Sequence, residues 1–362
     1  MVRDLSCIPK SELHLHLRGA MPLKVFLDLI RRHPTERVIS SASEAHRHLF
    51  HRYANIDNFC AIRSPTSEDV RALFRYQTFE QFLATWTFTG YFVRDKDDFR
   101  RLVQGVVHSL REQAVVYAEI TVSIIEYLQM GIALVDIADC LTEGCQVPGI
   151  RVQWIVDLVR DTGPEKAHCL LRDIIALRCP VIIGITLGGS EHLFPPAAFR
   201  DVYADARDRG LCLTVHAGEA LGPASIWDAI RLLGVQRVGH GVRAVEDPVL
   251  VAYLAEHEIP LEVCLTSNIR TGIYPSYDAH PVLALLNAGV PITINSDDPA
   301  FFDTQLTQEL TILSNLGLDE TRVRRIIENG FRYAFLPPGQ IQAYLDSVDR
   351  TWNRPCIDGG LQ

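Results

Sequence analysis

Four histidines and two aspartates stand at positions where a folded chain could gather them around one metal ion. Imidazole and carboxylate groups are ligands that zinc accepts readily, and three histidines with one carboxylate leave a coordination position for water. Zinc-bound water has a pKa of about 7, so such a set predicts hydrolytic chemistry at neutral pH. Each residue alone could equally be a hydrogen-bonded core residue, but their joint placement favours chemistry. The candidates are His14, His16, His216, His240, Asp297 and Asp298.

A glutamate accompanies one of these histidines. Glu219 follows His216 by three residues in the motif HAGE, close enough to enter the same site. A carboxylic acid there is a candidate proton donor. The structural alternative is a glutamate in the first turn of a helix, where the helix dipole stabilises its charge. Asp298 has a similar alternative, since the sequence DDP is also a turn or helix-start signal.

The elements that must position these residues are short β-branched runs, which alternate with helical stretches. Several runs are almost continuously apolar, as expected for strands covered on both faces. The candidate strands cover residues 12–17, 115–123, 151–159, 181–189, 212–218, 237–241, 260–267 and 291–298. Helices are expected between them, for example over 196–210 and over 280–289, where Gly289 is a helix stop. Alternating strands and helices of this number predict an α/β fold, a closed (β/α)8 TIM barrel, with its active site at the carboxyl ends of the strands.

One connection is much longer than the others. Residues 18–114 separate the first two candidate strands, too many for a structureless loop. Residues 34–100 include helical-looking and aromatic segments such as QTFEQFLATWTFTGYF. We therefore expect one barrel domain over residues 1–362, with a helical insertion roughly over 34–100 that forms a lid over the barrel mouth.

Composition excludes several classes of partner. The net charge is −9 and no lysine- and arginine-rich run occurs, which argues against nucleic-acid binding. The start of the chain lacks the apolar core of a signal peptide, and no uncharged apolar run approaches the roughly 18 residues of a membrane span. Nine cysteines are spread from Cys7 to Cys356 without a CxxC pair, which favours free thiols in a reducing compartment. The expected location is the cytoplasm, and self-association is left open.

Five motifs, taken in order, resemble those of the adenosine deaminase family: PKSELHLHLRGA, HAGE, VGHG, CLTSNIRTG and INSDDPAFF. The resemblance runs from about Pro9 to at least Phe302. It implies the metal-dependent hydrolase (β/α)8 barrel with a helical lid after the first strand, which agrees with the strand count reached independently. It also implies one zinc ion per chain, held by His14, His16, His216 and Asp297. No lysine stands at the end of the fourth strand to bridge a second metal.

The same resemblance implies roles for the residues around the metal. Glu219 would protonate N1 of a 6-aminopurine, and His240 would orient the attacking water and stabilise the developing charge. Asp298 would hydrogen-bond N7, and the backbone N–H of Gly189, in TLGGSE, would meet N3. Ammonia and the 6-oxopurine are the implied products.

Arg18 departs from the family pattern. The family usually has Asp, Glu or Asn at this position, and in adenosine deaminases the aspartate binds the 5′-hydroxyl of the ribose. An unpaired buried charge costs several kcal/mol, so Arg18 needs a partner. One alternative is a carboxylate of its own chain, such as one from the lid. The other, which we prefer on the sequence, is an anionic group at the 5′ end of the substrate, since a guanidinium grips carboxylate or phosphate in bidentate fashion.

The preferred substrate on these grounds is 6-amino-6-deoxyfutalosine, an intermediate of the alternative menaquinone route whose deaminases belong to this family. It is adenosine extended at C5′ by a carboxybenzoyl group, and the aromatic segment of the insertion could stack on that ring. A phosphate would instead indicate an AMP-like nucleotide, and adenosine itself, in purine salvage, is the main alternative. A non-catalytic nucleoside-binding protein and an amidohydrolase for another ring are further alternatives. The first is disfavoured because every implied catalytic residue is present, and the second because HAGE and SDDP favour purine deamination.

Overall fold

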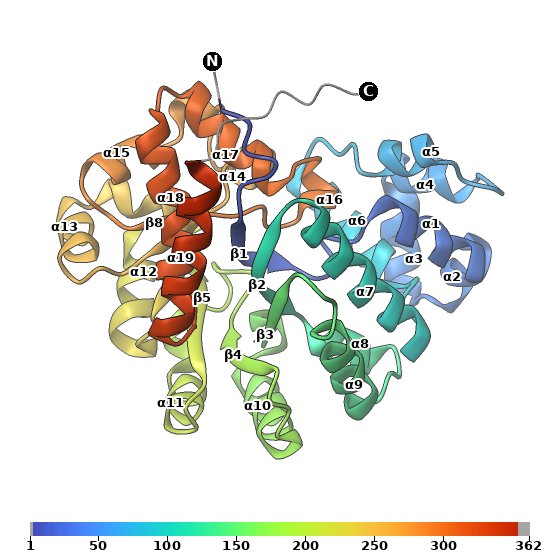
Figure 1. The fold of residues 1–362 in the computed structure, drawn as a ribbon. Helices are drawn as coiled ribbons and strands as arrows, with labels where there is room; N and C mark the ends of the chain where they lie inside the picture. The colour runs from blue at the N-terminus through green and yellow to red at the C-terminus, as the bar shows by residue number, and fades with distance from the viewer. Residues whose placement is uncertain (1–2, 354–362) are drawn as a thin grey trace, which may run out of the picture.

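Eight parallel strands lie side by side in chain order at the centre of the molecule (Figure 1). The computed structural model describes residues 3–353. The strands are β1 (Lys10–His16), β2 (Val115–Val122), β3 (Arg151–Asp157), β4 (Ile182–Thr186), β5 (Cys212–Ala217), β6 (Arg237–His240), β7 (Leu261–Val263) and β8 (Ile292–Ile294). Almost all their residues are buried, as the apolar runs predicted.

Asp297, three residues after the end of β8, joins the last strand to the first. The N–H of Asp297 donates to the carbonyl of His14 at 3.1 Å, and the N–H of His16 donates to the carbonyl of Asp297 at 2.9 Å. Leu15 and Asp297 form a parallel bridge at the same place. The sheet therefore curls into a nearly closed (β/α)8 barrel, as predicted.

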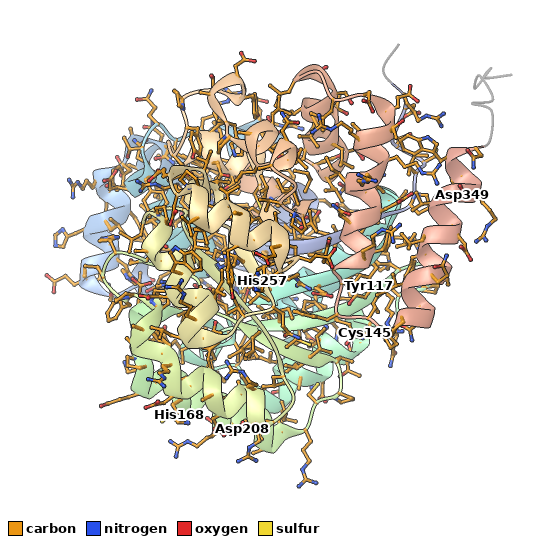
Figure 2. All side chains as sticks on the ribbon, turned by 90° about the vertical axis from the view of Figure 1, so that its left-hand side faces the viewer. Tyr117, Cys145, His168, Asp208, His257 and Asp349 are labelled. Atoms are coloured by element: carbon orange, nitrogen blue, oxygen red, sulfur yellow. The ribbon has the colours of Figure 1, made fainter. Side chains whose placement is uncertain are left out.

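Helices follow the strands and surround them (Figure 1), and side chains fill the space between the two layers (Figure 2). Those after β2 to β5 are α8 (Ile124–Gln129), α9 (Leu134–Gly144), α10 (Pro164–Leu177), α11 (Arg200–Asp208) and α12 (Pro223–Asp228). Those after β6 and β7 are α13 (Pro248–Glu256), α14 (Leu265–Arg270) and α15 (Val282–Asn287). Those after β8 are α16 (Pro299–Phe302), α17 (Leu306–Asn315), α18 (Glu320–Arg332) and α19 (Pro338–Trp352).

The long connection between β1 and β2 is helical, as predicted. Its helices are α1 (Leu23–Arg32), α2 (Thr35–Ser41), α3 (Glu44–Arg52), α4 (Ala54–Cys60), α5 (Ser67–Leu73), α6 (Phe79–Gly90) and α7 (Lys96–Glu112). Local signals start several of them: Thr66 and Asp69 form a capping box at α5, and Thr78 accepts the N–H of Gln81 at α6. Movement of this insertion as a lid stays a prediction.

Two predicted strands are wrong in their second halves: the run 291–298 is a strand only over Ile292–Ile294, and the run 260–267 turns into a helix. The run 260–267 forms a strand only over Leu261–Val263, and α14 begins at Leu265. The carboxylate of Glu309, on α17, accepts the N–H of Thr266 at 3.1 Å, which satisfies a free amide in the first turn of α14. A partner from a distant helix thus starts a helix inside an apolar run that is typical of a buried strand.

Two further expectations concern thiols and membranes. Every cysteine within residues 3–353 is a free thiol, and Cys356 lies outside the described residues. Among the helices of the described part, none has both the length and the apolar character that crossing a membrane requires.

Candidate active site

The five residues expected nearest the metal converge at one end of the barrel. His14 and His16 lie on β1, His216 lies near the end of β5, and His240 is the last residue of β6. Asp297 follows β8. His240 and Asp297 have left-handed backbones, with φ of +58° and +63°. Such conformations are costly for residues other than glycine, and they concentrate at functional sites.

The distances between side chains fit a shared ion. Nε2 of His16 lies 3.1 Å from Nε2 of His216 and 3.3 Å from Oδ1 of Asp297. Nε2 of His14 lies 3.5 Å from the same Oδ1 and is buried without a hydrogen-bond partner. Two ligands bonded at about 2.05 Å to a tetrahedral zinc stand about 3.3 Å apart. The spacing is therefore that of neighbouring ligands, and the cluster can bind a metal.

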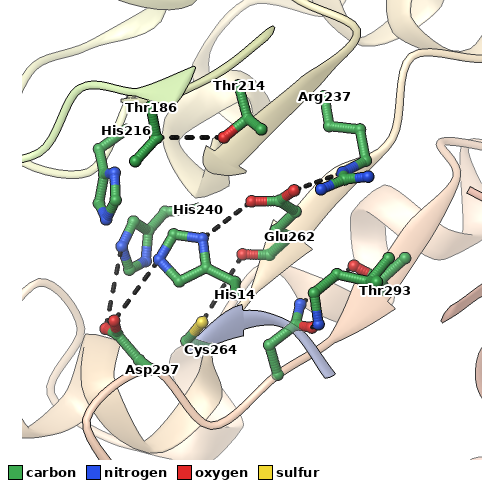
Figure 3. Close-up of polar contacts among 12 residues, drawn as sticks. His14, Thr186, Thr214, His216, Arg237, His240, Glu262, Cys264, Thr293 and Asp297 are labelled. Carbon is green, nitrogen blue, oxygen red and sulfur yellow. Dashed lines mark hydrogen bonds and ion pairs between the residues drawn. The ribbon is translucent and has the colours of Figure 1, made fainter. Parts of the chain in front are cut away.

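His240 adjoins this cluster. Its Nε2 lies 3.9 Å from Oδ2 of Asp297 (Figure 3), whereas His16 contacts the other oxygen, Oδ1. Ligand atoms of His14, His216, His240 and Asp297 all lie within 4.8 Å of one another, so these four form an alternative ligand set to the one with His16. The choice between the two sets depends on which nitrogen of His240 carries a proton.

A buried chain of charges holds His14 from behind (Figure 3). Its Nδ1 is 2.8 Å from Oε2 of Glu262, whose Oε1 accepts from Nε of Arg237 at 2.6 Å. Arg237 also donates to Glu119 at 2.5 Å. A carboxylate behind a ligating histidine holds the proton on Nδ1 and leaves Nε2 free for the metal.

The surrounding carboxylates favour positive charge at this place. Burial by itself lowers the pKa of His14, but hydrogen bonds with Asp297 and Glu262 outweigh it and raise that pKa to about 10. Burial also disfavours the charged form of His240 and lowers its pKa to about 3. The field that attracts a proton to His14 would equally attract a metal cation.

Glu219 faces the cluster, and a second glutamate holds its loop. Oε2 of Glu219 lies 3.6 Å from Nε2 of His240. Burial, with the nearby Asp297 and Glu191 carboxylates, raises the pKa of Glu219 to about 8. The buried carboxylate of Glu191 accepts the N–H groups of Gly218, at 2.7 Å, and of Ala220 and Leu221, both at 2.8 Å. Glu191 thereby fixes the backbone on both sides of Glu219.

Asp298 and Gly189 lie on the wall of the same cavity. Oδ1 of Asp298 is buried without a partner, and burial, followed by the charge of Asp297, raises the pKa of Asp298 to about 7. Gly189 has a φ of +98°, and a Cβ there would overlap the carboxylate of Asp161. Only glycine suits this backbone, which brings the main chain to the edge of the cavity.

The cavity measures about 500 Å³ and extends from the histidines to the insertion. Helix α6 supplies one apolar wall with Phe79, Phe82, Leu83 and Trp86, and Phe302 adds to it. Phe79 and Leu83 are 48% and 44% exposed, so apolar surface stays uncovered at the rim. The segment expected to offer aromatic rings to a ligand thus lies where a ligand would reach it.

Arg18 is paired within its own chain. Its two Nη atoms contact the carboxylate of Glu126 at 2.8 and 3.0 Å, and its guanidinium lies 4.1 Å above the ring of Trp86. Glu126 belongs to α8, so the partner does not come from the lid. Because β1 ends at His16, Arg18 lies in the following turn, where strand alternation no longer applies.

Glu126, and not Arg18, lies on the cavity wall. The side chain of Glu126 is 28% exposed, whereas that of Arg18 is 6% exposed. The sequence-based preference for direct contact between Arg18 and a substrate anion does not match this geometry, because the guanidinium already holds the Glu126 carboxylate through one hydrogen bond and one further ion-pair contact.

These observations define a barrel enzyme with a candidate metal centre at the carboxyl ends of its strands. The sequence matches the family model for adenosine deaminase over residues 61–351. The chain belongs to the adenosine deaminase family, whose members are hydrolytic deaminases of aminopurine-type substrates.

The relatives of this chain include proteins that carry two different names. An aminodeoxyfutalosine deaminase from Streptomyces avermitilis is 32% identical over 359 residues, covering 96% of this chain and 93% of that protein. An adenine deaminase from Bordetella parapertussis is 33% identical over 330 residues, covering 90% and 96%. The crystal structure of adenine deaminase from Arthrobacter aurescens aligns with a TM-score of 0.82 at 24% identity, covering 96% of this chain and 100% of that one. That similarity supports the fold.

Sequence reasoning missed the residues that support the site from behind. Glu262 lies in a predicted strand, and Glu191 lies in the loop that holds Gly189. No sequence motif at either position indicates which residue the glutamate contacts. Glu126 is likewise an ordinary helix residue by sequence. Their partners are distant in the chain, so their roles depend on the closed barrel.

Proposed function

We propose that the protein is a zinc-dependent deaminase of 6-amino-6-deoxyfutalosine, with His14, His16, His216 and Asp297 as the metal ligands. When bound, zinc would lower the pKa of a water molecule, so that it can lose a proton and act as a nucleophile at neutral pH. The support for this ligand set is the spacing of about 3.3 Å expected for tetrahedral neighbours, against observed separations of 3.1, 3.3 and 3.5 Å.

The remaining residues act on the purine. Glu219, protonated at neutral pH, would give its proton to N1 while water adds to C6. Asp298, whose pKa is raised to about 7, can donate to N7, and the backbone N–H of Gly189 would meet N3. Loss of ammonia then leaves the 6-oxopurine, so that one water is consumed for each ammonia released.

The observation that carries the choice of substrate is the cavity. A volume of about 500 Å³ lies in the range of sites for drug-sized ligands, and its aromatic wall on α6 runs from Trp86, whose ring centroid lies 6.3 Å from that of His16, to the exposed Phe79. If the purine binds beside the candidate metal ligands, space remains along the α6 wall for a second ring that is joined to the purine through the sugar. The relative from Streptomyces avermitilis bears the matching name.

Arg18 enters this proposal through Glu126. The pair puts a carboxylate on the cavity wall, which suits a hydroxyl donor such as a sugar hydroxyl. The carboxylate of the substrate would then lie nearer the open rim, beyond Phe79. Adenine is a second candidate substrate, favoured by the adenine deaminase relative from Bordetella parapertussis. Adenosine is the third.

A deamination screen tests the proposal. The zinc-loaded protein is mixed with 6-amino-6-deoxyfutalosine, adenosine, adenine and AMP, and the change in purine absorbance and the release of ammonia are followed. The highest kcat/KM is expected for 6-amino-6-deoxyfutalosine, with Glu219→Gln as the inactive control. A higher kcat/KM for adenine or adenosine would overturn the choice of substrate, and no deamination of any of the four would overturn the reaction.

A further inference from the structure

A buried chain of hydrogen bonds leads from a backbone amide to His240. The N–H of Val282 donates to Nδ1 of His280 at 3.1 Å, and Nε2 of His280 lies 3.1 Å from Oδ1 of Asn268. The amide nitrogen of Asn268 lies 3.3 Å from Nδ1 of His240. The three side chains are 5%, 0% and 1% exposed, so water does not compete for these contacts.

The direction of this chain follows from its first member. A backbone N–H can only donate, so Nδ1 of His280 must be the acceptor nitrogen of a neutral ring. Burial lowers the pKa of His280 to about 4, which keeps the ring neutral at physiological pH. The proton of His280 is then on Nε2, which requires an acceptor, and only the oxygen of the Asn268 amide satisfies it.

The consequence passes to His240. With its oxygen toward His280, Asn268 turns its NH2 group toward Nδ1 of His240, which must accept. We propose that Asn268 and His280 are positioning residues, which hold His240 in the tautomer that carries its proton on Nε2, facing the cavity. His240 then presents a hydrogen-bond donor toward the reacting water and is not a metal ligand.

This inference deepens the proposed function and discriminates between the two ligand sets. Nε2 of His240 lies 3.6 Å from Glu219 and 3.9 Å from Asp297, and a protonated nitrogen there can donate toward either carboxylate or toward a water between them. It cannot coordinate a metal, because the lone pair is used by the proton. The remaining ligand set for the metal ion is the one that contains His16, together with His14, His216 and Asp297.

Both relay residues are placed by short helices next to the site. Asn268 is on α14, and His280 precedes α15, where its Nδ1 satisfies a free amide of the first turn. The helix start thus fixes the tautomer of His280, and that tautomer fixes the next two side chains. The unexpected end of the strand after Val263 is what brings Asn268 to His240.

The tautomer is measured directly by nuclear magnetic resonance. Histidine nitrogens are isotope-labelled in the full chain, without metal or substrate, and the signal of His240 is identified by its loss in His240→Gln. The expected pattern is a protonated Nε2 and a bare Nδ1 in both His240 and His280. A proton on Nδ1 of His240, or on both nitrogens near neutral pH, would overturn the proposal.

Two variants test the relay itself. Asn268→Asp replaces the donor with a second acceptor, so His240 should move its proton to Nδ1, and kcat should fall about 10–100-fold with KM little changed. His280→Gln keeps one acceptor and one donor and should preserve the His240 pattern, whereas His280→Leu should not. The exposed His257 (Figure 2) offers a control, His257→Gln, with no effect expected.

An unchanged His240 signal in folded Asn268→Asp would refute the relay. Thermal unfolding of each variant separates a lost fold from a lost tautomer. Because the tautomer is read without substrate, the deamination screen can fail while this proposal stands, and the reverse is also possible.

Discussion

The carbonyl of Asp297 accepts the N–H of His16 at 2.9 Å, while Oδ1 of the same aspartate lies 3.3 Å from Nε2 of His16. Two residues 281 positions apart are thus joined through both backbone and side chain. The hydrogen bond that closes the barrel is also the one that sets the spacing of the metal site. The residue that closes the barrel therefore also brings its carboxylate to the histidines of β1.

Removal of the Asp297 carboxylate should empty the metal site. Asp297→Ala is expected to purify with little zinc, since its oxygen lies next to both histidines of β1. Elemental analysis of the purified protein measures this directly. Asp208→Ala, at an exposed position of the outer helix α11 (Figure 2), is the control and should retain about one zinc per chain. Full occupancy in Asp297→Ala would show that the carboxylate is not a ligand.

Neutralising Glu262 should lower the zinc affinity of the site without removing a metal ligand. Glu262→Gln loses the charge that holds the proton on Nδ1 of His14, and partners of this kind typically contribute about 10–100-fold to metal affinity. Competition with a coloured chelator measures the zinc affinity. An affinity equal to that of the unmodified protein would show that His14 needs no carboxylate behind it.

The rate should fall at alkaline pH because Glu219 must carry a proton. Its pKa is raised to about 8, so the acid form is present at neutral pH and is lost as pH rises through that value. kcat should then fall about tenfold per pH unit. Glu219→Gln should lower kcat by about 10²–10⁴-fold with zinc retained. A variant whose kcat stays within threefold of the unmodified enzyme, an interval of about 0.7 kcal/mol, would exclude this role.

Arg18 and Glu126 should behave as one unit. Arg18→Met leaves a carboxylate without its partner, and Glu126→Leu leaves a buried guanidinium, so each should destabilise the fold. The double variant should be more stable than the sum of the two losses predicts, with a coupling of about 0.5–3 kcal/mol. Denaturant unfolding of the four proteins measures the cycle. Additive losses would mean that the pair contributes nothing.

The ring of Phe79 at the rim of the cavity should affect KM for a long substrate and not for a short one. Phe79→Ser removes an aromatic contact worth about 0.5–1.5 kcal/mol, so KM for 6-amino-6-deoxyfutalosine should rise roughly 2–10-fold. KM for adenine should not change, since the free base has no second ring to place against Phe79. Val249→Ser, on α13 at a position that is 70% exposed, is the control. Equal effects on both substrates would place the ring of the substrate elsewhere.

From the amino-acid sequence the barrel could be predicted, together with the residues that we propose carry the chemistry. Period-two placement puts His14 and His16 on one face of a strand, and the run before each motif is apolar enough to be a buried strand. These are local properties of the chain, although the run 260–267 shows that a distant partner can decide where a strand ends. The order of strands and helices then leaves few alternatives to a closed parallel sheet.

The partners of these residues could not be predicted from the sequence and are visible only in the folded chain. Arg18 pairs with Glu126 across 108 positions, and His14 pairs with Glu262 across 248. The first turn of α14 after Val263 is capped by Glu309 on α17, which is 43 positions away from Thr266. Such contacts are not written in local periodicity, since any of several carboxylates could have served. The sequence indicates that a buried charged residue requires a partner of opposite charge. The folded barrel determines which residue that partner is.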